Sequence, residues 1–371
     1  MCKNVTPMRN SFFAVTKKRN THRKIQNPSL TRRFGIDVAK KTFDAALVSP
    51  EQHFPETPLR TVPVESFSRD PQGVEKFLAW MRELLKKAPG TPKVRAVMEA
   101  TGVYSIELSA WLCQQCAMPA PAIVNPERTA AFIKSMGLRN KTDRLEARAL
   151  AFYGAERRPA PYEPLTPEHR QLRELSRYRD ALIAEKVAES NREEQRPQGK
   201  VVRMLRARRE QQRKRDIAKV EDEMKRVIQT TPNLKKDLDL LVTIPGVAFI
   251  TAAVILAEMG DLRRFARARQ ATAFAGVTPR KIVSGTSVNG QPHLCKKGSA
   301  RVRQALYLAA MAAVRSKTQL RQTYEGLLQH AKLPMVALGA IMRKLVTIMR
   351  AILLTETEFQ PLWKTPPRIT A

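Results

Sequence analysis

The sequence predicts three folded parts: an α/β domain over residues 33–162, a helical coiled-coil hairpin over 163–230 and a mostly helical domain over 231–355. The first part alternates strand-type and helix-type segments after a hairpin, which is typical of a mixed sheet covered by helices. The second is long and polar, with apolar residues three and four positions apart. The third contains apolar stretches of helical length. Tails at 1–32 and 356–371 complete the chain.

Length and charge limit what the protein can be. The 371 residues leave room for two or three domains with substantial cores. The 66 Lys and Arg against 34 Asp and Glu give a net charge of +32, which predicts a polyanionic partner, first of all DNA. An anionic membrane surface is the weaker alternative. The longest apolar run, residues 247–257, is too short to cross a bilayer, and no run near the start suits a secretory signal. We therefore expect a cytoplasmic protein without a membrane partner.

The chain begins with a basic segment. Residues 1–33 contain nine Lys or Arg and no acid, so the segment is expected to be disordered until it meets phosphate. A solubilising tail and a natural start codon further along are the alternatives.

The α/β part is predicted from short apolar runs and helix signals. We expect strands at 33–39, 43–49, 93–98 and 120–124, of which the first two form a hairpin. Helices are expected at 71–87, 104–117, 126–136 and 141–155. Asp70-Pro71 supplies a helix cap followed by proline at the first helical position.

Two long helices are predicted to form the hairpin, separated by Arg196-Pro197-Gln198-Gly199. The apolar stripe of the first is Leu172, Leu175, Tyr178, Leu182 and Ile183, and that of the second is Ile217, Val220, Met224 and Val227. Residues 200–215 include eight basic residues and one acid. This face is either solvated or contacts nucleic acid, and the candidates for contact are Arg203, Arg206, Arg208 and Arg209.

The last part begins with an I-P-G-V turn at 244–247 that precedes an apolar helix at 248–259. This resembles a helix-hairpin-helix turn, in which the backbone around Gly246 would hold a phosphate. A plain helix–helix corner is the equal alternative. A loop at 281–300 and helices at 299–315, 318–331 and 333–354 follow.

The four cysteines predict no zinc site. Cys113 and Cys116 form a single C-x-x-C, without the second pair that zinc requires, and Cys2 stands alone. Reduced thiols are the favoured interpretation in the cytoplasm. A mixed site of His293 and Cys295 stays open.

Four acids have the placement of a two-metal site. Asp37 lies in the first strand among apolar residues, where an uncompensated acid is costly; ribonuclease-H-like folds present their first metal ligand in this way. The alternative is an edge strand with Asp37 facing water. Glu99 ends another strand, while Asp143 and Glu146 share one face of a helix. Hard carboxylate oxygens select Mg²⁺ or Mn²⁺. For the last two acids, a capped helix start paired with Arg144 and Arg148 is the alternative.

These motifs resemble the insertion-sequence transposases of the one-ten family, including its eleven-eleven subgroup. The resemblance rests on F-G-I-D-V-A-K-K-T-F at 34–43, M-E-A-T-G-V-Y at 98–104, V-N-P at 124–126, N-K-T-D-R-L-E-A-R-A-L-A at 140–151, I-P-G-V at 244–247 and F-A-G-V-T-P-R at 274–280. It implies a RuvC-like nuclease domain with a D-E-D-D set of acids, a coiled-coil insertion and a C-terminal transposase domain with a nucleophilic serine.

Carried to this sequence, the family's acids fall on Asp37, Glu99, Asp143 and Glu146. Glu146 departs from the family's aspartate and reaches one methylene further. The serine falls on Ser284, with Ser287 as the second choice; an ordinary Ser-Gly turn is the alternative. Attack by this serine would leave a phosphoserine link to DNA. Basic residues expected to contact nucleic acid around these motifs are Lys141, Lys296, Lys297, Arg301 and Arg303.

The resemblance also implies a bacterial, nucleoid-associated protein and its partners. It implies homodimers to homotetramers that share acids and serine between subunits, and a guide RNA, the bridge RNA, that pairs with donor and target DNA. Two other functions stay open: a junction-resolving nuclease in which water attacks, and a nucleic-acid-binding protein whose site has decayed, which Glu146 suggests.

Overall fold

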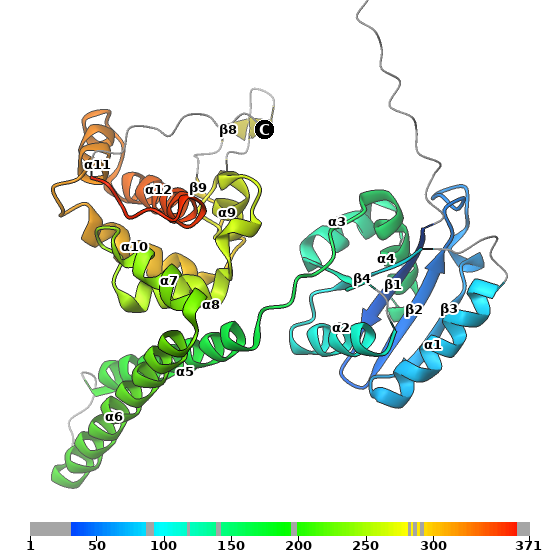
Figure 1. The fold of residues 1–371 in the computed structure, drawn as a ribbon, viewed down its shortest axis with the longest axis horizontal. Helices are drawn as coiled ribbons and strands as arrows, with labels where there is room; N and C mark the ends of the chain where they lie inside the picture. The colour runs from blue at the N-terminus through cyan, green and yellow to red at the C-terminus, as the bar shows by residue number, and fades with distance from the viewer. Residues whose placement is uncertain are drawn as a thin grey trace, which may run out of the picture. The chain divides into compact units, whose positions relative to one another are not determined.

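The structure is a computed structural model that describes residues 31–86, 93–116, 119–138, 142–193, 199–280, 283–284, 288–289 and 293–361. The predicted basic tail up to residue 30, Lys141 and Ser287 lie outside the described residues. The chain divides into two compact units, Met1–Pro164 and Leu165–Ala371 (Figure 1). No helix among the described residues is long and apolar enough to cross a membrane.

The first unit is built on a five-stranded mixed sheet. Its strands are β1 (Arg32–Val38), β2 (Thr42–Val48), β3 (Val64–Ser68), β4 (Val94–Glu99) and β5 (Ala122–Val124), in the order β3-β2-β1-β4-β5. The first three strands pair antiparallel, whereas β1, β4 and β5 pair parallel. The predicted hairpin of the first two strands is therefore confirmed, and β1 lies at the centre of the sheet. This arrangement fits the expected ribonuclease-H-like domain.

Helices cover both faces of the sheet (Figure 1). On one face, α1 (Pro71–Lys86) and α2 (Val103–Cys116) pack on large apolar side chains from alternate strand positions. These include Phe34, Ile36, Phe43 and Phe67. On the other face lie α3 (Pro126–Ser135) and α4 (Asp143–Arg157), over smaller residues such as Ala46 and Val97. Because side chains alternate along a strand, Gly35 and Asp37 belong to this second face.

The backbone of α4 lies directly against β1 at Gly35. A Cβ atom at this position would come within 2.1 Å of both the Ala147 carbonyl oxygen and the Ala151 amide nitrogen. One helical turn later, Gly154 lies over Val97 and the Cβ of Arg33. The helix therefore runs antiparallel to β1, which brings its first turn to the carboxyl end of that strand.

The sequence predictions for this unit missed two elements. Neither β3 nor the short helix η1 (Leu59–Thr61) was predicted, because the four prolines between residues 50 and 63 obscure the strand pattern of V-E-S-F-S at 64–68. The other predicted strands and helices lie within a few residues of the observed ones.

The second unit consists of a helical hairpin and a cluster of helices. Helices α5 (Pro167–Glu193) and α6 (Lys200–Thr230) lie side by side (Figure 1). The predicted seam is buried at Leu172, Leu182, Val220, Met224 and Val227. Tyr178 was wrongly placed in it, since its side chain is 57% exposed.

The cluster of helices follows the hairpin directly. It comprises α7 (Pro232–Val242), α8 (Phe249–Met259), η2 (Leu262–Arg264), α9 (Ala268–Phe274), α10 (Ala300–Ala313), α11 (Gln319–Gln329) and α12 (Pro334–Thr355). Of these, α7, η2 and α9 were not predicted individually. Short paired strands lie within and just before the predicted loop at 281–300: β6 (Pro279–Arg280) pairs with β9 (His293–Leu294), and β7 (Val283–Ser284) pairs with β8 (Val288–Asn289).

A buried ion pair ties the hairpin to the cluster. Glu258 in α8 is only 4% exposed and accepts hydrogen bonds from Arg177 in α5 at 2.8 and 3.1 Å, while Arg173 lies 3.6 Å away. Burial alone would raise the pKa of Glu258, but the hydrogen bonds and charge of Arg177 and the charge of Arg173 bring that pKa below its ordinary value. The two arginines thus compensate an acid that would otherwise be costly inside the unit.

The close approach at Gly35 gives the first prediction. Gly35→Ala is expected to lower the free energy of unfolding by about 2–3 kcal/mol, because its methyl group would overlap the backbone of α4. Urea unfolding of the full chain measures this. Gly326→Ala in α11 is the control, since no atom lies within 4 Å of its added Cβ, and it should cost nothing. Equal stability of Gly35→Ala and the wild type would contradict the packing described.

Candidate active site: an acidic cluster at the edge of the sheet

Three acids lie in a row across the carboxyl end of β1. Asp37 in β1 is the direct neighbour of Asp44 in β2, and the pairing of Ile36 with Met98 brings Glu99 of β4 to the other side. All three lie on or near the central strand, on the face that α4 covers. The alternative of Asp37 on a wet edge strand is therefore wrong, because β1 is central and Asp37 is half-buried.

The first turn of α4 adds the remaining two predicted acids. The helix begins after Thr142, whose hydroxyl accepts a hydrogen bond from the Leu145 amide at 3.3 Å. Asp143 and Glu146 occupy the first turn, where the exposed amide groups and the helix dipole favour negative charge. The capped helix start of the alternative is therefore present, whereas its two arginines have other contacts. Arg148 donates to the Val62 carbonyl oxygen at 3.0 Å, and Arg144 lies 4.0 Å from Glu65.

The negative charges of these acids all act on Asp37. Burial, and after it repulsion from Glu146, Asp143, Glu99 and Asp44, raises the pKa of Asp37 to about 7. The structure therefore brings all four sequence-predicted acids together around one carboxyl group. A cluster of this kind holds protons or cations more tightly than isolated carboxylates do.

Two residues of the cluster were missed in the sequence. Asp44 is only 9% exposed and accepts a hydrogen bond from the Ser66 hydroxyl of β3. Its signal was an acid within the apolar strand T-F-D-A-A-L-V, the same signal that identified Asp37. The buried Thr129 hydroxyl lies 2.8 Å from a Glu99 carboxylate oxygen and orients it. Asn125 accepts a hydrogen bond from the Glu127 amide and so starts α3 directly after β5, which carries Thr129 back towards Glu99.

The donor set of the cluster suits a hard divalent cation. It consists of carboxylate oxygens, which Mg²⁺ and Mn²⁺ prefer, and the neighbouring acids contribute to the raised pKa of Asp37. The carboxylates surround Asp37 without converging on one point: within the described ranges, no group of three or more His, Cys, Asp or Glu is arranged to hold a metal ion. The acids therefore fit a cation by chemistry and charge, and closing around it requires rotation of their side chains.

The predicted serine belongs to the second unit. The backbone of Ser284 lies in β7, where it pairs with Val288 of β8. Close by, Lys296 adopts a left-handed conformation with φ of 56°, and its amide donates to the Gly276 carbonyl oxygen at 3.2 Å. The guanidinium of Arg303 donates to the Gly298 carbonyl oxygen at 2.6 Å, and that of Arg301 to Asp180 at 3.1 Å. These two arginines therefore shape the turn before α10 and its contact with α5.

The basic start of α6 is only partly neutralised. Arg206 lies 3.5 Å from Glu189 of α5, whereas Arg203, Arg208 and Arg209 are exposed and form no ion pair with any acid that the structure describes. These three remain candidates for contact with a polyanion.

Gly246 has a structural explanation. It has a φ of +86°, and a Cβ there would lie 2.4 Å from the Ala309 carbonyl oxygen of α10. This close approach explains why a glycine is needed at this position. It supports the helix–helix corner, which the sequence left open as the alternative to phosphate binding.

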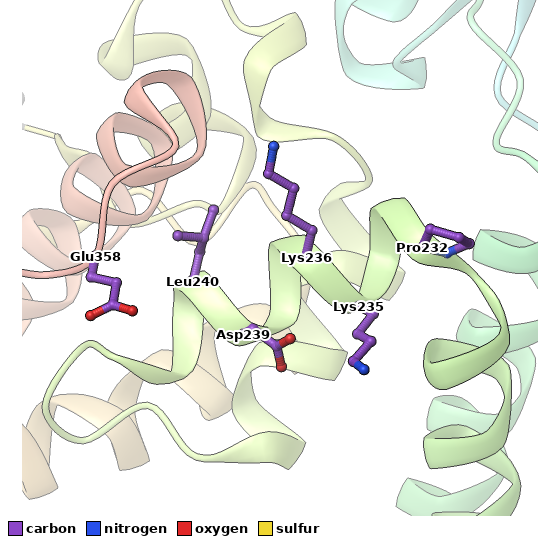
Figure 2. Close-up of a pocket in the computed structure, with 6 residues that line it drawn as sticks. All are labelled: Pro232, Lys235, Lys236, Asp239, Leu240 and Glu358. Carbon is purple, nitrogen blue, oxygen red and sulfur yellow. The ribbon is translucent and has the colours of Figure 1, made fainter.

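An open hollow beside α7 does not belong to the predicted sites. Figure 2 shows its lining side chains, with Lys235 and Lys236 pointing in different directions. The lining residues are Pro232, Lys235, Lys236, Asp239, Leu240 and Glu358. Lys236 pairs with Glu356 at 2.6 Å, and the hollow carries charges of both signs. No predicted site residue lines it, so we assign it no function.

Comparison with known proteins identifies both units. Residues 34–195 match the family DEDD_Tnp_IS110, described as a transposase, and residues 238–325 match a family described as Transposase IS116/IS110/IS902 family. The pilin gene-inverting protein of Moraxella bovis is 28% identical over 320 residues, which cover 86% of this chain and 94% of that protein. The counterpart from Moraxella lacunata has the same identity and coverage. The transposase for insertion sequence element IS1111A of Coxiella burnetii is 26% identical over 251 residues, covering 59% and 65% of the two chains.

The mixed sheet with its acidic edge and these matches define an enzyme of DNA transposition and recombination. The chain belongs to the IS110/IS116/IS902 family of transposases, the one-ten family that its motifs resemble. The DEDD type of the first matched domain indicates the use of a divalent metal.

The raised pKa of Asp37 gives the second prediction. The unfolded chain loses this proton near pH 3.8 and the folded chain near pH 7, so stability falls as the pH rises through this window. Asp37→Asn abolishes that loss. Without divalent cations at pH 8, the variant should therefore melt about 4–8 °C above the wild type, after allowance for solvent around a half-buried group. The difference should shrink towards pH 4.

Added Mg²⁺ or Mn²⁺ should stabilise the wild type at pH 8 and Asp37→Asn much less, because cation binding depends on the ionised cluster. Thermal unfolding with and without EDTA measures both effects. Glu75→Gln, on the exposed side of α1, controls for the loss of one negative charge. Identical melting of Asp37→Asn and the wild type at every pH would rule out the electrostatic account of the cluster.

Proposed function

We propose that this transposase cuts and rejoins DNA through a serine that forms a phosphoserine–DNA intermediate, assisted by Mg²⁺ or Mn²⁺ at the acidic cluster. The observation that carries the proposal is the placement of Glu99, Asp143 and Glu146 around Asp37 at the carboxyl edge of the sheet. A concentration of negative charge is costly, and divalent cations that take part in phosphoryl transfer would compensate it.

The acids would hold the cation, and the fold prepares them for it. Asp37 would be the shared central ligand, with Glu99 held in place by Thr129 and with Asp143 and Glu146 presented by the first turn of α4. When bound, divalent ions would stabilise the charge that develops on the phosphate and lower the pKa of an attacking hydroxyl. Glu146 is longer than the family's aspartate, and its single extra methylene leaves the carboxylate available to a cation.

The serine would form a phosphoserine ester that conserves the energy of the broken phosphodiester. Ser284 Oγ would form a bond to phosphorus while the bond between phosphorus and one DNA oxygen breaks. The leaving oxygen takes up a proton in exchange for the one that the serine gives up, so the freed DNA end carries a hydroxyl. Because the phosphoserine ester conserves the energy of the phosphodiester, rejoining to a new DNA end needs no nucleotide cofactor.

Recognition of DNA is proposed to depend on an RNA guide and on assembly into dimers or tetramers. Support comes from the family resemblance and from composition: the charge of +32 suits backbone contacts, while only 6% of residues are aromatic and able to stack on bases. The related Moraxella proteins are named for the inversion of pilin genes, which is a recombination of the kind that this chemistry performs.

A junction-resolving nuclease is the second candidate. It is favoured by one observation: the whole acidic cluster lies within the first unit and would suffice to activate water without any serine from the second.

Removal of the serine separates these two functions and gives the third prediction. With DNA that contains the element ends, the wild type should form a protein–DNA adduct that survives denaturation. Ser284→Ala should lose the adduct and recombination by roughly 10³-fold or more, because the nucleophile is gone. Ser287→Ala is the matched control and should keep both. Cleavage that persists in Ser284→Ala without an adduct would overturn the serine mechanism in favour of the nuclease.

A further inference from the structure

Three arginines surround a pocket at the amino end of the sheet, at the opposite end of β1 from the acidic cluster. Arg33 lies in β1 and Arg95 in β4, and Arg158 directly follows α4 as its C-cap residue. The pocket has a volume of about 220 Å³. Its walls are completed by residues of the strands β4 and β5 and of two connecting segments, namely Ala96, Val97, Ala120, Ala122, Pro159, Ala160 and Pro161.

The fold holds these arginines side by side. Arg33 and Arg95 are direct neighbours on parallel strands, in register with each other. Arg158 has a left-handed φ of 46°, and its amide donates to the Gly154 carbonyl oxygen at 3.2 Å, so the chain turns sharply out of α4 there. The Tyr162 amide then donates to the Pro121 carbonyl oxygen at 2.9 Å, which fixes the wall formed by 159–161.

This arrangement is electrostatically unfavourable without a ligand. Like charges directly opposite each other on neighbouring strands destabilise a sheet. Burial and then the charges of Arg158 and Arg95 lower the pKa of Arg33. None of the three guanidinium groups pairs with an acid in the part of the chain that the structure describes, whereas Arg69 pairs with Glu107 at 2.7 Å in the same unit.

The end of α4 does not supply enough compensation. Its last carbonyl groups face this side, and a helix C-terminus is equivalent to about half a negative charge. Three guanidinium charges exceed that several-fold. The pocket therefore has an excess of positive charge that an anion would neutralise, and arginine forks match the oxygens of a phosphate group.

The size and position of the pocket limit which ligand it can bind. The pocket is smaller than the roughly 300–1,000 Å³ typical of small-molecule sites, so it suits a phosphate group but not a whole nucleotide. Arg33 and Asp37 are four positions apart in an extended strand, about 13 Å, which is too far for one phosphate to occupy both sites. We propose that the pocket of Arg33, Arg95 and Arg158 binds a backbone phosphodiester of DNA or RNA that is not the one being cut. This goes beyond the proposed function and does not depend on the serine chemistry.

The test uses the full chain with Arg33→Gln and Arg95→Gln combined. Arg60→Gln with Arg82→Gln removes the same charge from two exposed positions of the same unit and is the matched control. Binding of duplex DNA and of single-stranded RNA is measured by fluorescence anisotropy over a series of salt concentrations. The pocket variant should bind about tenfold more weakly, and its salt slope should fall by about 0.9 for duplex or 0.7 for single strands, as for one lost phosphate.

The nucleic acid whose binding weakens identifies the source of the phosphate, and weakening of either or both supports the proposal. Equal behaviour of the pocket variant and the control with both nucleic acids would overturn it.

Thermal unfolding adds a second readout: inorganic phosphate should stabilise the wild type and the control but not the pocket variant. Without phosphate the pocket variant should melt no lower than the wild type, since repulsion is relieved; a lower melting temperature would indicate a structural role and contradict the proposal. Ser284→Ala should leave the salt slope unchanged, so the two proposals can fail separately.

Discussion

The contact between the backbones of α4 and β1 at Gly35 determines the rest of the first unit. Because no side chain separates them, the helix runs along the central strand and antiparallel to it. Its negatively charged first turn then meets the carboxyl end of the strand, where Asp37 lies, and its last turn meets the amino end, where Arg33 lies. One packing interaction thus places an acidic cluster and an arginine pocket at opposite ends of the same strand. Both concentrations of charge cost free energy, and the apolar cores on the two faces of the sheet stabilise the arrangement against them.

The second unit uses its excess of basic residues in two ways. Some arginines are internal partners: Arg177 compensates the buried Glu258, and Arg263 forms two hydrogen bonds with the buried Asp237 at 2.6 and 2.8 Å. Others, such as Arg208 and Arg209 on α6, are exposed. A count of positive charges in the sequence predicts a polyanionic partner but does not separate these two groups. Arg301 and Arg303 illustrate this, since both were expected to contact nucleic acid and both have partners within the unit.

Much of the site was predictable from the sequence because its signals are local. An acid inside an apolar strand indicated Asp37, and an acid at a strand end indicated Glu99. These two made metal binding the favoured interpretation for Asp143 and Glu146, which lie three positions apart in α4. What remained hidden depends on contacts between distant segments. Asp44 shows the same local signal as Asp37, but its place in the cluster follows only from the register of β2 against β1. The role of Thr129 and the meeting of Arg33, Arg95 and Arg158 likewise depend on how the strands align and where α4 ends. At Gly246 the signal is local but ambiguous, because a phosphate-binding turn and a close helix contact both require glycine.

The central claim is that the four acids act as one site for divalent cations. Diffraction from crystals of the full chain soaked in Mn²⁺, recorded with anomalous scattering, tests it most directly. The account predicts a Mn²⁺ peak bounded by carboxylate oxygens of Asp37 and Glu99 and of at least one of Asp143 and Glu146. Mn²⁺ bound only elsewhere on the protein, with these four carboxylates pointing away from one another, would contradict it.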